Sequence, residues 1–266
     1  MSANAIDIFP LHGRSRSQIG AIPLGVASPY GLYVDKRERL YVVTSYAGVK
    51  VYAPRSGSVA PIATYAQRLN TALYPVVDGN GDLFVSIADH AESGAVIEFK
   101  AGSTSLYRVL TIPNSDEADG LDFDQYGNLY VAYRDEDGYA SIEEFSSGSF
   151  AGKSLGMSLD QPQGLVVDNR NNILVVETGS ADRIDLFAPG QSTPSVEQSV
   201  PGIPVQLAIT RDERTLKVST LSGDVFTMPY PFGTQRGVYL KDKTGSKSQG
   251  VALTDEQTFS VDPRSR

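Results

Sequence analysis

One pattern repeats along this chain of 266 residues. In each copy a short apolar strand is followed by a polar turn and a second apolar strand, as in GLYVDKRERLYVV from Gly31 and GLVVDNRNNILVV from Gly164. The residue that closes the first strand recurs at intervals of 42 to 46 residues, and its positions are Asp35, Asp78, Asp124, Asp168, Thr210 and Thr254. This is the period expected of a propeller blade.

A second pattern lies between these copies and predicts a third strand. It alternates apolar residues, carries an aromatic residue or Met, and ends in a Pro, Gly or Ser cluster, which is typical of a strand followed by a turn. The aromatic or Met positions are Tyr52, Phe99, Phe145, Phe187 and Met228. A weaker fourth strand follows each time, as in LYRVLTI from Leu106. Each unit is therefore predicted to contain four strands.

The two ends of the chain complement each other. The last unit supplies only two strands, near residues 251–253 and 258–261, and the segment AIDIFPLHGRSRSQIG from Ala5 resembles the missing third and fourth, with Phe9 in the place of Tyr52. Pairing of these ends would leave no free sheet edge in the ring. We therefore predict an all-β fold: a single domain over residues 1–266, a six-bladed β-propeller of four-stranded antiparallel blades, closed by N-terminal strands that complete the C-terminal blade.

Charge and composition exclude several functions. Acidic residues outnumber basic ones and give a formal charge of −8, which argues against nucleic acid or an anionic membrane surface as partner. The chain has no cysteine, so disulfides and thiol chemistry are excluded. No apolar run is long enough to insert into a membrane, and no signal peptide is recognisable at the N-terminus. A monomer is expected.

The repeats resemble a known family. Gly-Leu-x-Val-Asp followed by Gly-Asn-Leu-Tyr-Val, and then Arg-Ile-x-Leu-Phe, is similar to NHL repeats and to the wider group of gluconolactonase-like six-bladed propellers. The likeness covers nearly the whole chain and implies the fold. It says little about activity, because function lies in sites grafted onto folds. Segments such as VYAPRSGSVAPIATY from Val51 look like bacterial extracytoplasmic proteins of this type, which implies a periplasmic or secreted location.

The longer predicted loops all belong to one end of the blades, which we call the upper face, and on blades two to four they are acidic. Loops on a rigid scaffold are where binding residues concentrate. The acidic face predicts either a solvated rim that keeps the protein soluble or a funnel for a metal ion or a cationic ligand. Ca²⁺ is the candidate cofactor, since it binds carboxylate and carbonyl oxygens. Asp135-Glu136-Asp137-Gly138 looks like a fragment of a calcium loop but lacks the remaining ligand spacing.

Lactonases of the similar group, as the resemblance implies, hold a divalent cation with Glu, Asn and Asp side chains just before the Gly of each first strand. The corresponding positions here are Tyr30, Tyr74, Asp119, Gln163, Val205 and Gln249. Tyr30 stands where a Glu is expected and Val205 where an Asp is expected. Asp119 and Gln163 therefore remain as candidate metal ligands, and the known lactonase site is incomplete.

Other residues are candidates for ligand binding on the upper face. His90 is the one plausible histidine base, because His12, the other histidine, falls in a turn on the opposite face. Glu177 is predicted to form a salt bridge with Arg183 inside its blade. Tyrosines near the channel mouth suit a small ligand or a peptide, and they are Tyr30, Tyr74, Tyr133 and Tyr139.

Asp122 occupies a strand position that is apolar or aromatic in other copies. A carboxylate there needs a partner, for which Arg134 is the candidate, or its pKa should rise.

Three hypotheses follow. The first is a non-catalytic propeller that binds a protein, a peptide or a small polar or cationic ligand on the upper face through Tyr30, Tyr74, His90, Asp119, Tyr133, Gln163, Glu177 and Gln249. The second is a divergent metal-dependent hydrolase of the gluconolactonase-like type, with Asp119 and Gln163 among the ligands. The third is a structural module without a small-molecule site, which would have no convergent polar pocket.

Overall fold

The computed structural model describes residues 4–10, 20–25, 29–44, 47–53, 59–65, 71–88, 94–180, 182–232, 240–243, 251–253 and 257–262. Within these ranges every regular element is a β-strand, and no helix there is long and apolar enough to span a membrane. The strands form six four-stranded sheets, and neighbouring strands pair in antiparallel fashion throughout.

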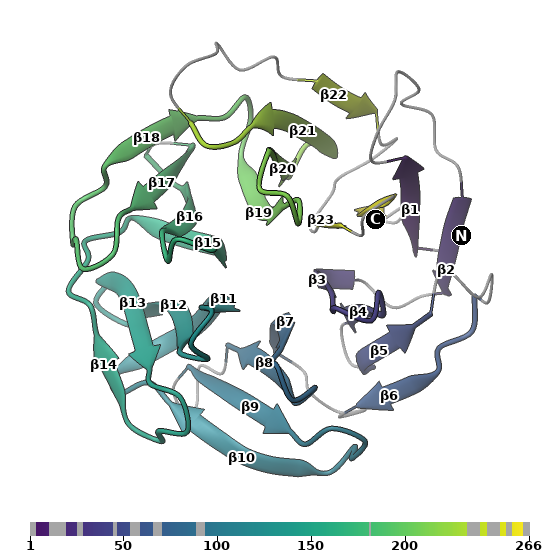
Figure 1. The fold of residues 1–266 in the computed structure, drawn as a ribbon, viewed down its shortest axis with the longest axis horizontal. Coiled ribbons are helices and arrows are strands. Elements are labelled where there is room, and N and C mark those ends of the chain that lie inside the picture. The colour runs from purple at the N-terminus through teal and green to yellow at the C-terminus, as the bar shows by residue number, and fades with distance from the viewer. Residues whose placement is uncertain are drawn as a thin grey trace. The chain divides into compact units, whose positions relative to one another are not determined.

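The chain divides into two compact units, which we call the first unit (Met1–Asn70 with Gly202–Arg266) and the second unit (Thr71–Pro201). Each unit contains three of the sheets (Figure 1). In the second unit the strands run in sequence order across each sheet. They are β7 (Ala72–Val77), β8 (Leu83–Ile87), β9 (Ala95–Phe99) and β10 (Leu106–Thr111); β11 (Ser115–Phe123), β12 (Leu129–Asp135), β13 (Ala140–Phe145) and β14 (Gly152–Ser154); β15 (Gln161–Val167), β16 (Ile173–Thr178), β17 (Arg183–Phe187) and β18 (Val196–Ser199). The first strand of the middle sheet, β11, contacts both β7 and β15.

The first unit holds two sheets of the same kind and a third built from both ends of the chain. The first two sheets are β3 (Pro29–Val34), β4 (Leu40–Thr44), β5 (Gly48–Tyr52) and β6 (Ala63–Tyr65); β19 (Pro204–Ile209), β20 (Thr215–Thr220), β21 (Asp224–Pro229) and β22 (Leu240–Lys243). The third has the order β2-β1-β24-β23 and consists of β1 (Asn4–Pro10), β2 (Gly20–Gly25), β23 (Val251–Leu253) and β24 (Gln257–Asp262).

The predicted pairing of the two ends is confirmed. β1 lies beside β24, with Ile6 opposite Val261 and Phe9 opposite Thr258, and β2 follows as the outer strand. The N-terminal strands therefore supply the third and fourth strands of a sheet that the C-terminus begins. This pairing satisfies backbone groups that would otherwise form an open edge at β24.

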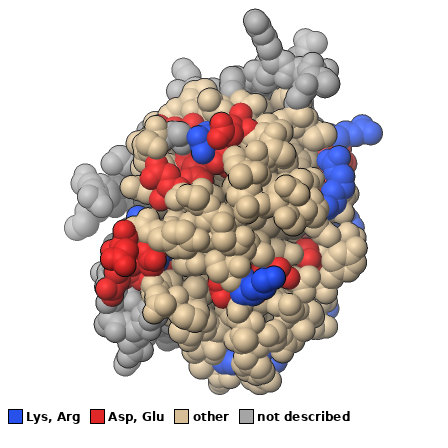
Figure 2. Space-filling view, turned by 90° about the vertical axis from the view of Figure 1, so that its left-hand side faces the viewer, with Lys and Arg blue, Asp and Glu red and all other residues tan. Residues whose placement is uncertain are grey.

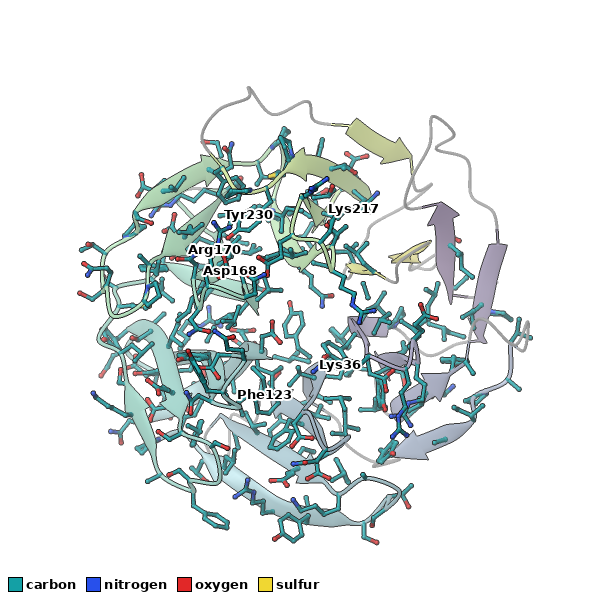
Figure 3. All side chains as sticks on the ribbon, viewed as in Figure 1. Lys36, Phe123, Asp168, Arg170, Lys217 and Tyr230 are labelled. Atoms are coloured by element: carbon teal, nitrogen blue, oxygen red, sulfur yellow. The ribbon has the colours of Figure 1, made fainter. Side chains whose placement is uncertain are left out.

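The repeated aspartate has a local structural cause. In the turn after β15, Asp168 Oδ1 accepts hydrogen bonds from the backbone N–H groups of Arg170 (2.9 Å) and Asn172 (2.8 Å), and Asn171 takes the left-handed conformation (φ 61°). Arg170 lies beside the same carboxylate in Figure 3, with Nε 3.5 Å from Oδ2. Asp35, Asp78 and Asp124 accept the same pair of backbone bonds. An aspartate at this position therefore closes the turn between the first two strands.

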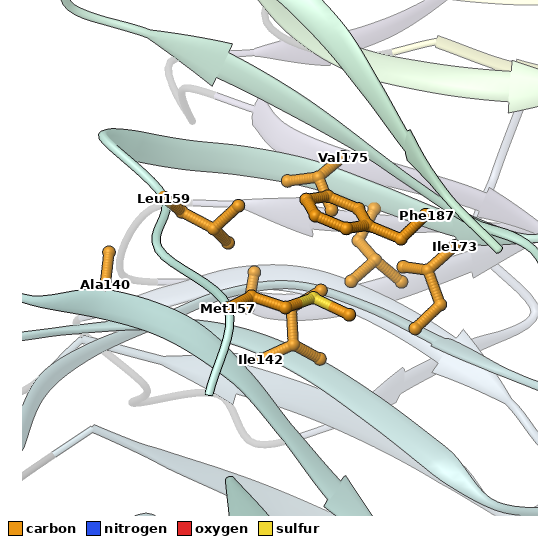
Figure 4. Packing of buried hydrophobic residues seen from close by; sticks show 9 residues of the cluster. Ala140, Ile142, Met157, Leu159, Ile173, Val175 and Phe187 are labelled. Carbon is orange, nitrogen blue, oxygen red and sulfur yellow. The ribbon is translucent and has the colours of Figure 1, made fainter. Parts of the chain in front are cut away.

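In five sheets the aromatic residue or Met of the third strand is a core residue, namely Tyr52, Phe99, Phe145, Phe187 and Met228. Phe187 is 1% exposed and packs with Val175 and Met157 in a cluster between neighbouring sheets of the second unit (Figure 4). Met157 and Leu159 come from the connection between the sheets, while Ile142 comes from β13. Sheet-to-sheet packing of this kind buries the apolar side of each strand, as the period-two pattern predicts.

Candidate functional site

The first strand of five sheets carries a β-bulge at the positions that the repeat alignment singles out. In β11 the register shifts between Ala118 and Leu121, so that Asp119 and Gly120 lie opposite the single residue Ala132. Equivalent shifts occur in β3, β7, β15 and β19. The residues that precede or occupy the glycine position in these bulges are Tyr30, Tyr74, Asp119, Gln163 and Val205. Bulges re-aim side chains and are common next to active sites.

Asp119 is the most deeply buried of these five residues. It is 2% exposed, and among the described residues its carboxyl group forms no hydrogen bond. Burial raises the pKa of Asp119 well above its usual range; the nearby negative charge of Glu117 adds to this effect and the positive charge of Arg134 opposes it. The Asp119 carboxyl group therefore holds its proton more tightly than an exposed aspartate does.

Glu117 and Arg134 form a salt bridge beside Asp119, between β11 and β12. Both side chains are partly exposed. The sequence did not predict this pair, because it depends on the register of β11 against β12, where the two residues are opposite each other. The sequence did contain one indication of this salt bridge. Between Asn114 and Asp137 many residues are acidic, and Arg134 is the single basic residue.

Tyr74 and Asp119 are the two predicted site residues that the structure brings together. Tyr74 lies in the β7 bulge and is 7% exposed. Its pKa is raised, first by burial and then by the negative charges of Asp119 and Glu117. The Ser86 hydroxyl of β8 accepts a hydrogen bond from the Tyr74 backbone N–H (3.1 Å), so the bulged backbone is satisfied within its own sheet.

Gln163 lies on the other side of Asp119, in the β15 bulge. The contact between these strands is close, because a Cβ atom on Gly120 would lie 2.3 Å from both the Gln163 carbonyl oxygen and the Leu165 nitrogen. The Gln163 side chain turns back on its own strand, where Nε2 donates to the Pro162 carbonyl oxygen (3.1 Å). The side-chain NH₂ group of Gln163 is therefore already hydrogen-bonded within β15.

Among the described residues, the predicted metal ligands Asp119 and Gln163 are not joined by enough further ligands to bind a metal ion. Among the residues that the structure describes, no group of three or more His, Asp or Glu side chains is arranged to hold a metal ion. The charged group nearest to the Asp119–Glu117 pair is the Arg134 guanidinium. Asp119 and Gln163 alone do not fit Ca²⁺, which takes six to eight oxygen ligands.

The predicted salt bridge between Glu177 and Arg183 is wrong. Arg183 pairs with Asp185 (Nε to Oδ1, 2.7 Å) and with Glu197 (3.3 Å). Glu177 Oε2 accepts a hydrogen bond from the Asp160 backbone N–H (2.6 Å), and burial raises the pKa of Glu177 to about 6. Glu177 thus anchors the connection that leads into β15, because its buried carboxylate satisfies a loop N–H that would otherwise lack an acceptor.

The hydroxyl groups of Tyr133 and Tyr139 have hydrogen-bond partners within the second unit. Tyr133 is buried, and its hydroxyl lies 3.1 Å from Ser154 Oγ on the outermost strand β14, so the side chain extends outward across β13. Tyr139 is exposed and donates to the Met157 carbonyl oxygen (3.4 Å). Tyr30 is 37% exposed and belongs to the first unit. His90 and Gln249 lie outside the described residues.

Asp122 has a partner other than the predicted Arg134. Its Oδ2 accepts a hydrogen bond from the Val167 backbone N–H (2.9 Å), and Oδ1 accepts one from the Phe123 N–H (2.9 Å). Burial raises the pKa of Asp122 to about 7, against these two hydrogen bonds, which lower it. The expected rise in pKa is confirmed, whereas Arg134 is occupied by Glu117.

Acidic side chains gather in patches on the face drawn in Figure 2, and basic side chains lie beside several of these patches. The exposed residues Glu136 and Asp137 belong to the turn between β12 and β13. In that turn the carboxylate of Asp135 accepts a hydrogen bond from the Tyr139 backbone N–H (2.7 Å). This carboxylate therefore stabilises its own turn, as in the other Asx turns of the chain.

Comparisons with solved structures decide the fold class. A protein assigned as a gluconolactonase superposes with a TM-score of 0.64 at 15% identity, over 85% of this chain and 80% of that one. The chain is a β-propeller. A gluconolactonase from Xanthomonas campestris matches this propeller with a TM-score of 0.58 at 17% identity, over 76% of this chain and 72% of that one. The PQQ-bound form of an aldose sugar dehydrogenase from Streptomyces coelicolor gives 0.61 at 13% identity, over 97% and 98%.

At these identities the likeness concerns the fold of the propeller. No family model matches the chain, and no curated protein matches it.

Proposed function

We propose that this chain is a six-bladed propeller of the NHL type that binds a small, polar, positively charged ligand at the bulged ends of β7 and β11, without catalysing a reaction. The observation that carries the proposal is the Asp119 carboxyl group, which is 2% exposed and makes no hydrogen bond among the described residues. Neither carboxyl oxygen is among the fully buried atoms that lack a partner, so a ligand can reach the group and supply the hydrogen-bond partner.

Charge balance favours a cation as the ligand. If Asp119 were ionised, Asp119 and Glu117 together would carry two negative charges against the single positive charge of Arg134. An ammonium group beside Asp119 would complete the balance and would displace the Asp119 proton. The exposed acidic residues Glu136 and Asp137 nearby would raise the local concentration of cations.

The absence of a catalytic role is supported by the same geometry. A carboxyl group that holds its proton more tightly than usual is less available as an ionised general base. The described part of the chain offers Asp119 no companion metal ligands. Its nearest predicted companion, Gln163, is turned toward Pro162.

Three probes of similar size but different charge test the proposal: ethanolamine, ethylene glycol and glycolate. We expect ethanolamine alone to raise the melting temperature, because a ligand that binds only the folded state stabilises it. Calorimetric titration in two buffers of different ionisation enthalpy should detect a release of protons when the amine binds at neutral pH. Asp119→Asn should weaken binding at least tenfold.

The matched control is Asp137→Asn, which removes an exposed carboxylate from the same acidic surface. This variant should retain binding within about twofold, since exposed charges contribute little. Equal stabilisation by all three probes, or unchanged amine binding in Asp119→Asn, would refute the proposal.

Hydrolysis of a sugar lactone is the second candidate function. It is favoured by the names of the structural neighbours, two of which are gluconolactonases and the third a sugar dehydrogenase. A pH-stat assay on a panel of sugar lactones, with Ca²⁺ and again with a chelator, tests it. A rate above buffer that Asp119→Ala abolishes would support the hydrolase, and rates equal to buffer in both conditions would exclude it.

A further inference from the structure

Asn80 and Gly81 form the only Asn-Gly pair in the sequence. They lie in the turn between β7 and β8, where Asn80 is exposed to solvent. In such a pair the backbone nitrogen of the glycine can attack the side-chain amide carbon of the asparagine, because no Cβ atom of the glycine obstructs the approach. The reacting atoms belong to adjacent residues, so the reaction is intramolecular and is favoured by proximity.

The attacking nitrogen of Gly81 is weakly held. Its N–H donates to the Asp78 carbonyl oxygen, and at 3.2 Å this hydrogen bond is at the long end of the normal range. Among the described residues, a Cβ atom on Gly81 would meet only Ala101 Cβ, at 3.6 Å. The Asn80 side chain donates from Nδ2 to Asp78 Oδ2 (3.2 Å). Neither group is therefore packed in a way that prevents the approach.

Asn128, in the turn between β11 and β12 of the next sheet, is better protected. Its Nδ2 donates to Asp124 Oδ2 (2.9 Å), and its Oδ1 accepts from the Ser147 backbone N–H (3.0 Å). The residue after it is Leu129, which is 2% exposed and carries a Cβ atom beside the backbone nitrogen. Asn128 therefore serves as the comparison site within the same protein.

We propose that Asn80 is a site of spontaneous covalent modification, at which the side-chain amide is lost as ammonia. The Gly81 backbone nitrogen gives up its proton and forms a bond to Asn80 Cγ. The bond from Cγ to Nδ2 breaks, and Nδ2 leaves with that proton as ammonia, so that a cyclic imide joins the two residues. Water then cleaves one of the two bonds between the imide nitrogen and its carbonyl carbons. Cleavage at Cγ gives an aspartate at position 80, and cleavage at the backbone carbon gives an isoaspartate.

Either product weakens the turn. The Asn80 amide now donates to Asp78 Oδ2, whereas a carboxylate in its place cannot donate and repels the Asp78 charge. The isoaspartate also lengthens the backbone between two N–H groups, those of Asn80 (2.9 Å) and Asp82 (2.8 Å), which donate together to Asp78 Oδ1. These two hydrogen bonds close the turn, and the longer backbone separates their donors.

The weakening extends beyond the turn, because Asp82 is 7% exposed and connects it to the rest of the sheet. Its carboxylate accepts from the Ala101 backbone N–H (2.8 Å) and pairs with Lys100 Nζ (2.8 Å). Lys100 also pairs with the buried Glu98 of β9. A shift of Asp82 would therefore disturb the partners of a second buried carboxylate, which is costly to leave unpaired.

The experiment is incubation of the full chain in water labelled with heavy oxygen, at several mildly alkaline pH values, followed by peptide mapping with mass spectrometry. Conversion at Asn80 should be about tenfold or more faster than at Asn128, with one labelled oxygen atom in each product. The rate should rise with pH, because the attacking nitrogen must lose its proton. An intact amide at Asn80, equal rates at the two sites, or a rate independent of pH would each overturn the proposal.

Asn80→Asp and Asn80→Ser test the proposed loss of stability. Both variants remove the Nδ2 donor, but only Asn80→Asp adds a negative charge beside Asp78. Asn80→Asp should melt about 1–2 °C below Asn80→Ser at low salt, and the difference should shrink at high salt. Circular dichroism should give the same fold for both. Equal melting temperatures at low salt would contradict the effect of the new charge. None of these readouts depends on amine binding at Asp119.

Discussion

The carboxyl group of Asp122 on β11 accepts a hydrogen bond from the backbone N–H of Val167 on β15, at 2.9 Å. The two residues belong to adjacent sheets that share no strand. First strands of neighbouring sheets do not pair with each other, so an inward N–H such as that of Val167 needs a side-chain acceptor. Asp122 provides this acceptor at the cost of holding a half-buried carboxyl group.

This arrangement predicts a pH dependence of stability. The pKa of Asp122 rises from 3.8 to about 7 on folding. At a pH between these two pKa values, the Asp122 carboxyl group has lost its proton in the unfolded chain and retains it in the folded chain. Asp122 therefore lowers the free energy of unfolding as pH rises through this window, by at most about 1.4 kcal/mol per pH unit, and the loss levels off above the folded pKa.

Asp122→Asn isolates this contribution, because the amide oxygen still accepts from Val167 but does not titrate. Relative to wild type, the variant should gain stability between pH 4 and pH 8, by at most roughly 4 kcal/mol, as measured by urea unfolding. Asp137→Asn is the control and should follow wild type at every pH. A parallel shift of the Asp122→Asn curve at all pH values would contradict the assignment.

Gly120→Ala should be severely destabilising. The new Cβ would lie 2.3 Å from backbone atoms of Gln163 and Leu165, which cannot move without separating β11 from β15. We expect a loss of about 3 kcal/mol or more in the free energy of unfolding. Gly138→Ala, where no atom lies within 4 Å and the strain is only that of a positive φ, should cost roughly 1 kcal/mol. Equal losses would show that the close contact is absent.

Asp168→Ala tests the turn that the repeat encodes. It removes the acceptor of two backbone N–H groups, at Arg170 and Asn172, and should lower the free energy of unfolding by roughly 2 kcal/mol. Asp168→Asn keeps one side-chain oxygen and should lose less than half as much. Chemical denaturation measures both, and an equal loss in the two variants would argue against the hydrogen bonds as the cause.

Gln206→Leu tests a clamp in the first unit. The Gln206 amide donates to the Leu32 carbonyl oxygen (2.7 Å) and accepts from the N–H groups of Leu32 (3.3 Å) and Val251 (3.2 Å). Its removal leaves these buried backbone groups without a partner, at a cost of roughly 2–3 kcal/mol. Gln191→Leu, at an exposed position in the turn between β17 and β18, should change stability by less than about 0.5 kcal/mol. Thermal melting distinguishes the two.

Arg134→Gln tests the charge balance at the proposed ligand site. Arg134 opposes the rise in the pKa of Asp119, so its removal leaves two acidic groups without a compensating cation. Ethanolamine should bind about tenfold more tightly, equivalent to ~1.4 kcal/mol, in a calorimetric titration. Weaker binding in this variant would mean that Arg134 itself contacts the ligand.

The positions of several residues of the candidate site could be predicted from the sequence, but the hydrogen-bond partners of its carboxyl groups could not. Asp119, Tyr74 and Gln163 could be selected because they share one position in the repeat, and all three lie in bulges. The partners predicted for Glu177 and Asp122 were wrong, since both predictions paired a carboxylate with an arginine. In the structure each carboxylate accepts from a backbone N–H of another segment, and such donors leave no mark in a sequence.

The strands, the turns between them and the pairing of β1 with β24 could all be read from the order of the amino acids. These features depend on residues close together in a repeat: alternating apolar positions, an aspartate that accepts two N–H groups of its own turn, and a segment at each end that lacks the other's strands. Which side chains meet between sheets, and which carboxyl groups are buried, became known only from the folded chain. Those contacts depend on bulges, on close approaches such as that at Gly120, and on desolvation, all of which arise when distant strands pack together.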